Sequence, residues 1–192
     1  MATLTMKVGR VDLRKDARHN RERILNAGRE LFTDSADVPM YEVARKAGVG
    51  QATLYRHFAD RYALLDAIAQ LELAAFAELA AAQAREPDGV LVLLQDITQR
   101  ITNLRGLAEM IRNAPPDASQ RSRRDEIGAL FEKPLRAAQA AGTVRADLDK
   151  GDILRIIVMI EGAILDEPDP ARRRFTAQRA QALLLDGIRP AR

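Results

Sequence analysis

Apolar residues recur at helical spacing along almost the whole chain, and breaks rich in Gly and Pro separate the segments that carry them. A spacing of three and four residues places side chains on one face of an α-helix, whereas a half-buried strand alternates apolar and polar residues. No segment alternates in that way. Aromatic residues make up only 4% of the chain, while the helix-favouring residues Ala and Leu are abundant. The sequence therefore predicts an all-α protein.

Start and stop signals divide this pattern into expected helices. Pro39 fits a first helical turn, Gly48 fits a left-handed helix end, and Asp60 and Asp169 fit helix caps. Asp149 and Asp152 also fit helix capping, which we prefer to a metal site because no calcium-loop spacing is present. The expected helices cover residues 16–34, 40–47, 51–57, 60–84, 90–113, 121–141, 153–165 and 171–188.

The composition excludes several classes of protein. There is no cysteine, so disulfides and thiolate metal sites are excluded. The N-terminal residues lack the continuous apolar core of a secretory signal. The densest apolar stretch, residues 153–165, is too short to span a bilayer. We therefore expect a soluble, cytoplasmic protein that does not contact the membrane.

Positive charge is concentrated near the N-terminus. Residues 1–61 hold 12 Lys and Arg against 8 Asp and Glu, whereas the other residues hold 18 against 19. The net charge of +3 therefore arises entirely from the N-terminal third. This asymmetry favours a polyanion-binding end followed by a neutral remainder.

The segment "AGVGQATLYRHF", residues 47–58, joins two short expected helices through Gly48-Val49-Gly50. Leu54 and Phe58 are four residues apart and face the core, so the other side chains of residues 51–57 lie on or near the surface. In a DNA major groove, Gln pairs with adenine and the methyl groups of Ala and Thr contact thymine. Tyr, Arg and His suit phosphate oxygens. The pattern predicts a helix-turn-helix motif.

A glycine-rich phosphate loop is the competing interpretation of the two glycines. That loop needs a preceding apolar strand, and either a third glycine or a following Lys-Ser/Thr pair. Neither the strand nor the other motif residues are present. The glycines therefore serve the backbone turn.

At this point the residues resemble a known family. "RERILNAGRELF" and "VARKAGVGQATLYRHFADRYALL" resemble the DNA-binding domain of the TetR/AcrR transcriptional regulators over residues 21–68. The resemblance implies a homodimer in which three N-terminal helices bind DNA. The remaining helices would bind a small-molecule inducer and dimerise.

The resemblance and the charge pattern together give three expected segments. These are a flexible basic arm at residues 1–15, a helix-turn-helix domain at 16–60, and a helical effector-binding and dimerisation domain at 61–192. The expected DNA-binding residues are Gln51, Ala52, Thr53, Tyr55, Arg56, His57 and Arg61. Arg14, Lys15 and Arg18 form either a DNA-contacting part of the arm or a solvated tail.

The C-terminal part predicts an effector pocket and a dimer interface. Its middle helices carry apolar residues that either line a pocket or fill a core: Phe76, Leu79, Ile101, Leu104, Leu107, Met110, Phe131, Leu135 and Met159. Residues 153–165 are apolar around the whole helix, which favours packing on a partner as well as on the protomer's own core. The expected interface residues are Ile153, Ile157, Ile160, Ile164, Ala180, Leu183, Leu184 and Ile188.

The expected function is a homodimeric, sequence-specific transcriptional regulator that binds a near-palindromic operator in double-stranded DNA and is released as a repressor by a small-molecule effector. His19 and His57 are the only histidines, and no Gly-x-Ser-x-Gly or Glu-x-x-His motif occurs, so we expect neither catalysis nor a cofactor nor a metal. One alternative is an architectural DNA-binding protein without an effector. Another is a helical ligand-binding protein or enzyme whose DNA-binding domain is silent.

Overall fold

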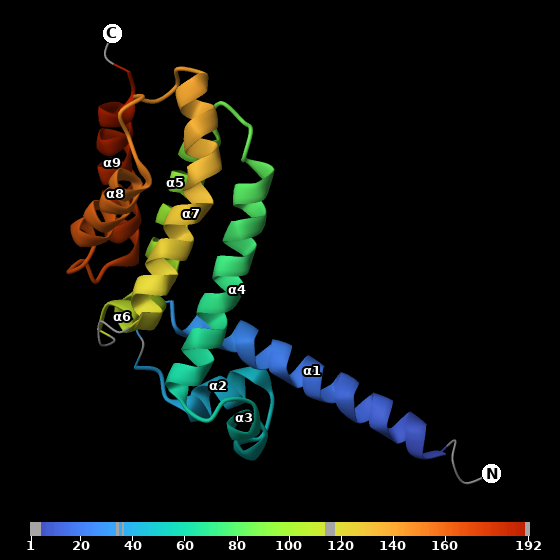
Figure 1. The fold of residues 1–192 in the computed structure, drawn as a ribbon. Helices are drawn as coiled ribbons and strands as arrows, with labels where there is room; N and C mark the ends of the chain where they lie inside the picture. Colours follow the sequence, from blue (N-terminus) through green and yellow to red (C-terminus); the bar gives the residue numbers. More distant parts are fainter. Residues whose placement is uncertain (1–4, 34, 36, 114–117, 191–192) are drawn as a thin grey trace.

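The computed structural model describes residues 5–33, 35, 37–113 and 118–190, with side chains described for 15–33, 35, 37–109 and 123–190. All regular secondary structure in these ranges is α-helical, as the sequence predicts. The first three helices gather around one end of a long fourth helix, and the later helices form an elongated bundle along the rest of it (Figure 1).

The N-terminal unit contains α1 (Thr5–Leu31), α2 (Met40–Ala47) and α3 (Gln51–His57). The bounds of α2 and α3 are those predicted from the sequence. Side chains of α1, α2 and α3 share one apolar core with the beginning of α4 (Arg61–Ala82). Its largest fully buried members are Ile24, Phe32, Leu54, Leu64, Leu65 and Ile68.

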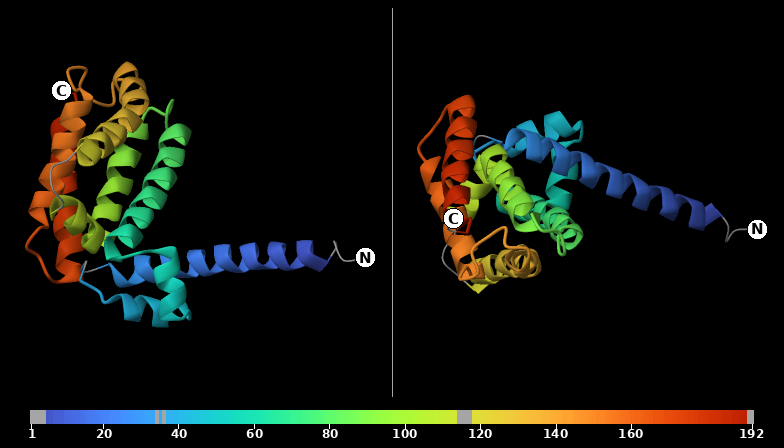
Figure 2. Two further views of the ribbon diagram at one scale, coloured as in Figure 1. Left: turned by 60° about the horizontal axis from the view of Figure 1, so that its bottom comes forward. Right: turned by 90° about the horizontal axis from the view of Figure 1, so that it is seen from above.

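Helix α1 begins at Thr5, whereas the sequence indicated a flexible arm up to residue 15. Residues 5–15 contain no proline and only one glycine, Gly9, so nothing in this segment interrupts the helix. The N-terminal half of α1 projects away from the rest of the protein (Figures 1 and 2). The helix therefore crosses the expected boundary between arm and domain.

Helix α4 belongs to two cores. The Asp60 carboxylate caps it by accepting a hydrogen bond from the Ala63 N–H at 2.8 Å. Leu64 and Ile68 enter the N-terminal core, while Phe76 enters a second core made with the C-terminal helices. One helix therefore contributes side chains to both cores.

The expected helix over residues 90–113 is instead two helices, α5 (Gly89–Asn103) and α6 (Arg105–Asn113). The break falls at Leu104, where φ is −123° and ψ is 51°. The N–H groups of Arg105 and Gly106 donate to the carbonyls of Thr33 and Phe32, each at 3.0 Å, instead of to the preceding turn. Tertiary hydrogen bonds to the end of α1 therefore replace the helical continuation that the local sequence favours.

The bundle is completed by α7 (Ala118–Ala140), α8 (Lys150–Ala163) and α9 (Pro170–Ile188). The predicted caps are confirmed. Asp149 and Asp152 form a capping box at the start of α8, and Asp169 accepts a hydrogen bond from the Arg172 N–H at 2.7 Å, with Pro170 at the first position of α9. Pro134 lies inside α7.

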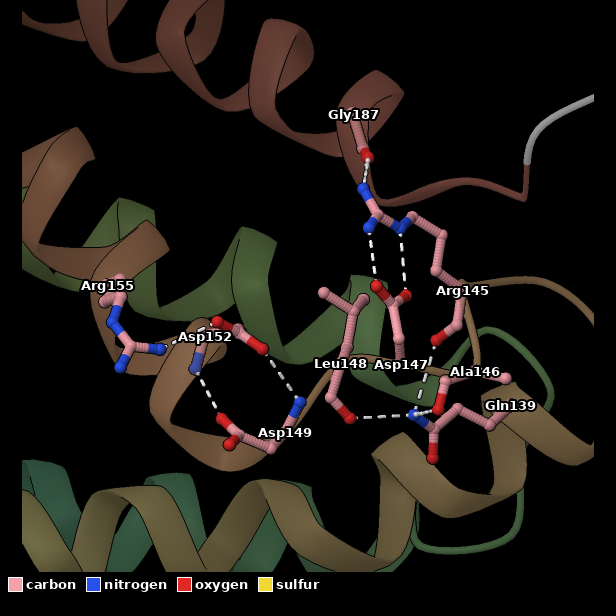
Figure 3. A network of polar contacts seen from close by, with 9 residues as sticks. All are labelled: Gln139, Arg145, Ala146, Asp147, Leu148, Asp149, Asp152, Arg155 and Gly187. Carbon is pink, nitrogen blue, oxygen red and sulfur yellow. Dashed lines mark hydrogen bonds and ion pairs between the residues drawn. The ribbon is translucent and has the colours of Figure 1, made fainter.

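The loop between α7 and α8 is held by a polar network (Figure 3). The Gln139 side-chain amide donates to the carbonyls of three loop residues, and Arg145 forms a bidentate pair with Asp147. The hydrogen bond from Arg145 lowers the pKa of the Asp147 carboxyl. The Arg145 N–H donates to the carbonyl of Ile188 at 2.9 Å, so the network also fixes the end of α9.

The contact between α6 and α1 predicts a requirement for glycine at position 106. A Cβ at Gly106 would lie 2.5 Å from the carbonyl oxygen of Phe32 and 2.6 Å from that of Ser35, and backbone cannot move aside as a flexible side chain can. We expect Gly106→Ala to lower the free energy of unfolding by about 1–3 kcal/mol. Urea denaturation followed by circular dichroism measures the loss.

Gly187→Ala is the matched control, because Gly187 lies in a helix and a Cβ there would meet nothing within 4 Å. The control should unfold at the urea concentration of the unmodified protein or slightly above it. Equal stability of Gly106→Ala and Gly187→Ala would contradict the close approach of α6 to α1.

Candidate nucleic-acid interface

The turn between α2 and α3 depends on Gly48. This residue has φ 62° and ψ 38°, a left-handed conformation, and its N–H donates to the end of α2. The Arg23 guanidinium of α1 donates to the Gly48 carbonyl at 3.0 Å and fixes the turn on α1. Gly50 has ordinary extended geometry and begins α3 by accepting hydrogen bonds from Thr53 and Leu54.

Two apolar anchors orient α3. Leu54 is fully buried, and Phe58 directly follows the helix and is buried in the same core. The Arg21 guanidinium lies 5.3 Å from the centre of the Phe58 ring, which adds a cation–π contact from α1. These contacts fix which side of α3 faces the protein and which side faces solvent.

The outward side of α3 carries the predicted DNA-binding residues. Gln51, Ala52 and Arg56 are exposed, Tyr55 is 50% exposed, and Thr53 and His57 are half-buried. The structure therefore brings all six onto one short helix with small and amide side chains near its N-terminus. A surface of this kind fits a major groove, where amide and methyl groups contact base edges and cationic groups contact phosphates.

Arg61 occupies the first position of α4, beside this surface. Its Nη1 atom lies 2.5 Å from Oδ1 of Asp37, in the segment between α1 and α2. Nothing in the local sequence pattern relates residues 37 and 61, so this partner of Arg61 could not be predicted from the sequence. A DNA phosphate that bound Arg61 would therefore share its guanidinium group with the exposed carboxylate of Asp37.

Other basic residues of the N-terminal third hold the domain together. Besides Arg21 and Arg23, Lys46 forms an ion pair with Glu30 of α1, with Nζ and Oε2 2.6 Å apart. Arg45 is exposed on α2. Some of the Lys and Arg residues behind the positive charge of the N-terminal third therefore stabilise the domain through contacts within it.

The basic residues of the expected arm lie on the projecting part of α1. Lys15 and Arg18 are exposed, and Arg18 approaches Glu22 at 3.9 Å. The side chain of Arg14 lies outside the described side chains. Lys15 and Arg18 are therefore presented on a helix, and not on the extended strand of chain that reaches into a minor groove in other DNA-binding domains.

Family comparisons cover both parts of the chain. Residues 24–68 match the family described as bacterial regulatory proteins, tetR family. Residues 86–190, more than half of the chain, match the C-terminal domain of the family described as SbtR-like transcriptional regulators. The chain belongs to the TetR family of transcriptional regulators.

Individual TetR relatives resemble the chain over nearly its full length. The HTH-type transcriptional regulator UidR of Escherichia coli K12 is 26% identical over 190 residues, covering 90% of this chain and 95% of UidR. The crystal structure of a TetR transcription regulatory protein from Mycobacterium vanbaalenii has a TM-score of 0.68 and 29% identity, covering 93% of this chain and 99% of that one. The TetR regulator SCO0520 of Streptomyces coelicolor has a TM-score of 0.67 and 28% identity, covering 90% and 99%.

These findings make the helix-turn-helix a DNA-binding element of a TetR-family regulator. The family is one of transcriptional regulators and not of enzymes. None of the helices in the part of the chain that the structure describes is long and apolar enough to cross a membrane.

A cavity of about 690 Å³ lies among α4, α5, α6, α7 and α8. Five of the residues predicted for an effector pocket line it: Phe76, Ile101, Leu104, Leu107 and Met159. Leu79, Phe131 and Leu135 instead pack into or against the second core and do not line the cavity. The side chain of Met110 lies outside the described side chains. Helical spacing identified the inward faces, but not which inward residues border empty space.

The expected dimer interface needs a correction on α8 and α9. Ile153, Ile160, Ile164 and Ile188 are buried in the protomer's own core, because α8 packs against α5, α7 and α9, and so they are not available to a partner. Ile157, Ala180 and Leu184 are partly exposed, and Leu183 is 56% exposed. Val158 of α8 and Phe175 of α9, which are not among the expected interface residues, are 53% and 71% exposed.

The geometry of the turn predicts different responses at its two glycines. An alanine at Gly48 would adopt a left-handed conformation, and its Cβ would lie 2.3 Å from the Arg23 guanidinium. We expect Gly48→Ala to lower the free energy of unfolding by about 1–2 kcal/mol. Gly50→Ser should leave it equal or raise it by a few tenths of a kcal/mol, because serine is a better N-cap and the position is open. Urea unfolding of both variants tests this, and loss of stability in Gly50→Ser alone would contradict the assigned turn geometry.

Proposed function

We propose that the protein is a homodimeric, sequence-specific regulator that binds a near-palindromic operator and releases it when a small molecule occupies the cavity in the C-terminal domain. The observation that carries the proposal is the orientation of α3. Leu54 and Phe58 hold the helix, and its N-terminal amide and methyl side chains face outward. In this proposal the protein acts as a repressor, which blocks transcription while it is bound to the operator and no longer does so once the ligand has released it.

The outward residues of α3 have two roles in this proposal. Gln51 reads an adenine through its amide, and the methyl groups of Ala52 and Thr53 contact thymine. Tyr55, Arg56 and His57, together with Arg61 of α4, bind phosphate oxygens and set the position of α3 in the groove without reading sequence. Lys15 and Arg18 extend the positive surface along α1.

Exposed apolar side chains on α8 and α9 support dimerisation. Val158, Phe175 and Leu183 are each more than half exposed, and Val158 also lines the cavity. Exposed apolar side chains that gather on one surface mark protein–protein contacts. We infer that these residues, with Ile157, Ala180 and Leu184, contact the same two helices of a second copy. A two-fold axis there would present two α3 helices to one face of the DNA.

Two connections relate the cavity to the DNA-binding helices. At the first, the start of α6 donates backbone hydrogen bonds to the end of α1, while Leu107 of α6 lines the cavity. At the second, Glu72 of α4 pairs with Arg29 of α1 at 2.6 Å and with Arg100 of α5 at 2.5 Å. Glu72 and Arg100 both line the cavity.

Ligand occupancy acts through these connections. A molecule in the cavity displaces the cavity-facing parts of α4, α5 and α6, and the hydrogen bonds and ion pairs transmit the displacement to α1 and α3. The distance between the two α3 helices of the dimer then departs from the operator spacing. Thermodynamic linkage requires DNA and ligand to weaken each other's binding by the same factor.

Substitutions at Gln51 and Tyr55 test the two roles of α3. Gln51→Ala should bind the preferred duplex about 10-fold more weakly or worse while non-specific binding stays unchanged, because a bidentate base contact is lost. Tyr55→Phe removes only the hydroxyl group and should weaken all duplexes alike. Competition binding of each variant to a preferred and a scrambled duplex measures both effects. An equal loss on both duplexes for Gln51→Ala would rule out base reading.

A double-mutant cycle tests the ion-pair connection between α1 and α4. Arg29→Gln and Glu72→Gln should show a coupling of about 0.5–1 kcal/mol in the free energy of unfolding, reduced from a fully buried pair because Arg29 is half-exposed. The pair Arg18 and Glu22, at 3.9 Å on the surface, is the control and should show almost no coupling. Equal coupling energies in the two cycles would contradict the proposal that the pair of Arg29 and Glu72 connects α1 with the cavity.

A further inference from the structure

The cavity in the C-terminal domain carries an excess of positive charge. Among the described residues that line it, four are arginines and two are glutamates. One of the glutamates, Glu72, is only 9% exposed and already pairs with Arg29 and Arg100. Its negative charge is therefore compensated before any ligand enters. The other glutamate, Glu161, also has an interaction partner within the protein, so neither carboxylate is free for a cationic ligand.

The four arginines differ in how fully they are paired. Arg100 pairs with Glu72 and Asp96, so its charge is neutralised inside the protein. Arg155 pairs with Asp152 on its own helix, and its side chain is mostly exposed. The guanidinium groups of Arg100 and Arg155 are therefore both ion-paired within the protein.

Arg123 and Arg124 are consecutive residues of α7, and among the described residues Arg124 is the unpaired arginine of these four. Arg123 forms one ion pair, with Nη2 and Oδ1 of Asp66 2.6 Å apart. Arg124 is exposed and has no ion pair or side-chain hydrogen bond within the described part of the chain. A guanidinium has five N–H donors in a planar arrangement, which matches a carboxylate, phosphate or sulfonate group.

The rest of the cavity is apolar. Phe76, Ile97, Ile101, Leu104, Ile127 and Met159 contribute to its walls. We propose that the effector is an apolar molecule with one anionic group, and that Arg124, assisted by Arg123, binds this anion. The inference rests on the proposed function, since it specifies the chemistry of the ligand that the proposed regulator senses.

The same residues connect the anion to the DNA-binding domain. Asp66, the partner of Arg123, lies on α4 between Leu65 and Ile68, which belong to the core of the N-terminal domain. An anion that binds Arg123 competes with Asp66 and so weakens the ion pair that joins α7 to this part of α4. A neutral molecule of the same shape fills the cavity but leaves that ion pair intact.

Two fluorescent probes with one aromatic skeleton test the anion requirement. 1-Anilinonaphthalene-8-sulfonate carries a sulfonate group, and N-phenyl-1-naphthylamine is neutral. The purified full chain should bind the sulfonate more tightly. Arg124→Gln should raise the sulfonate Kd about 10-fold or more, as expected for loss of a charge-assisted hydrogen bond. It should leave the Kd of the neutral probe unchanged, which also shows that the cavity is intact.

Arg136→Gln is the matched control. Arg136 lies on the same helix, is exposed, and does not line the cavity. This variant should bind both probes as the unmodified protein does. Equal affinity of the unmodified protein for the two probes, or the same sulfonate Kd in Arg124→Gln and Arg136→Gln, would overturn the proposal.

Displacement of the bound sulfonate probe identifies the anion. Dodecanoate, dodecyl phosphate and dodecanol share one alkyl chain and differ only in the head group. Displacement by dodecanoate or by dodecyl phosphate supports the anion site. The stronger competitor of the two shows whether the site prefers a carboxylate or a phosphate group. Equal displacement by dodecanol would contradict it.

Operator binding separates this inference from the proposed function. If the sulfonate probe binds through Arg124 and weakens operator binding, both the anion site and ligand-controlled release are supported. If it binds through Arg124 and leaves operator affinity unchanged, the anion site stands and ligand-controlled release fails. If the neutral probe binds as tightly as the sulfonate and also releases the DNA, the proposed function stands and the anion inference fails.

Discussion

The arrangement of the two domains depends on the hydrogen bonds between the start of α6 and the end of α1. Every helix begins with N–H groups that have no partner inside the helix, and ends with carbonyls in the same condition. Here the N–H groups of Arg105 and Gly106 satisfy the carbonyls of Thr33 and Phe32, so each helix end completes the other. The contact is possible because Gly106 has no side chain to keep the two backbones apart.

Side chains reinforce this junction on both sides. The Arg105 guanidinium donates to the carbonyls of Leu165 and Glu167 between α8 and α9, so one residue connects the end of α1 with the helices that we assign to dimerisation. Glu72 connects α1 with α5. The cavity is therefore bordered by the same helices that fix the position of the DNA-binding domain, which is the arrangement a ligand-controlled regulator requires.

Local signals predicted the parts of the structure that local interactions determine. The left-handed Gly48, the bounds of α2 and α3, and the caps Asp60, Asp149 and Asp169 follow from the preferences of single residues and short spacings. The break at Leu104 could not be predicted in this way, because its cause is a hydrogen-bond partner some 70 residues earlier in the chain. For the same reason, periodicity placed Phe131 and Ile153 inward without showing that they fill a core and do not border a cavity or a partner.

Selection of binding sites from a random duplex DNA library tests whether the protein reads DNA sequence as a symmetric dimer, because a palindromic consensus requires both a base-reading α3 and a two-fold pair of these helices. We expect the DNA retained by the purified protein to share a near-palindromic sequence, with two half-sites about one helical turn or a small multiple of it apart. Retained DNA without any shared sequence, together with a steep dependence of binding on salt, would contradict it and indicate binding to the phosphate backbone alone.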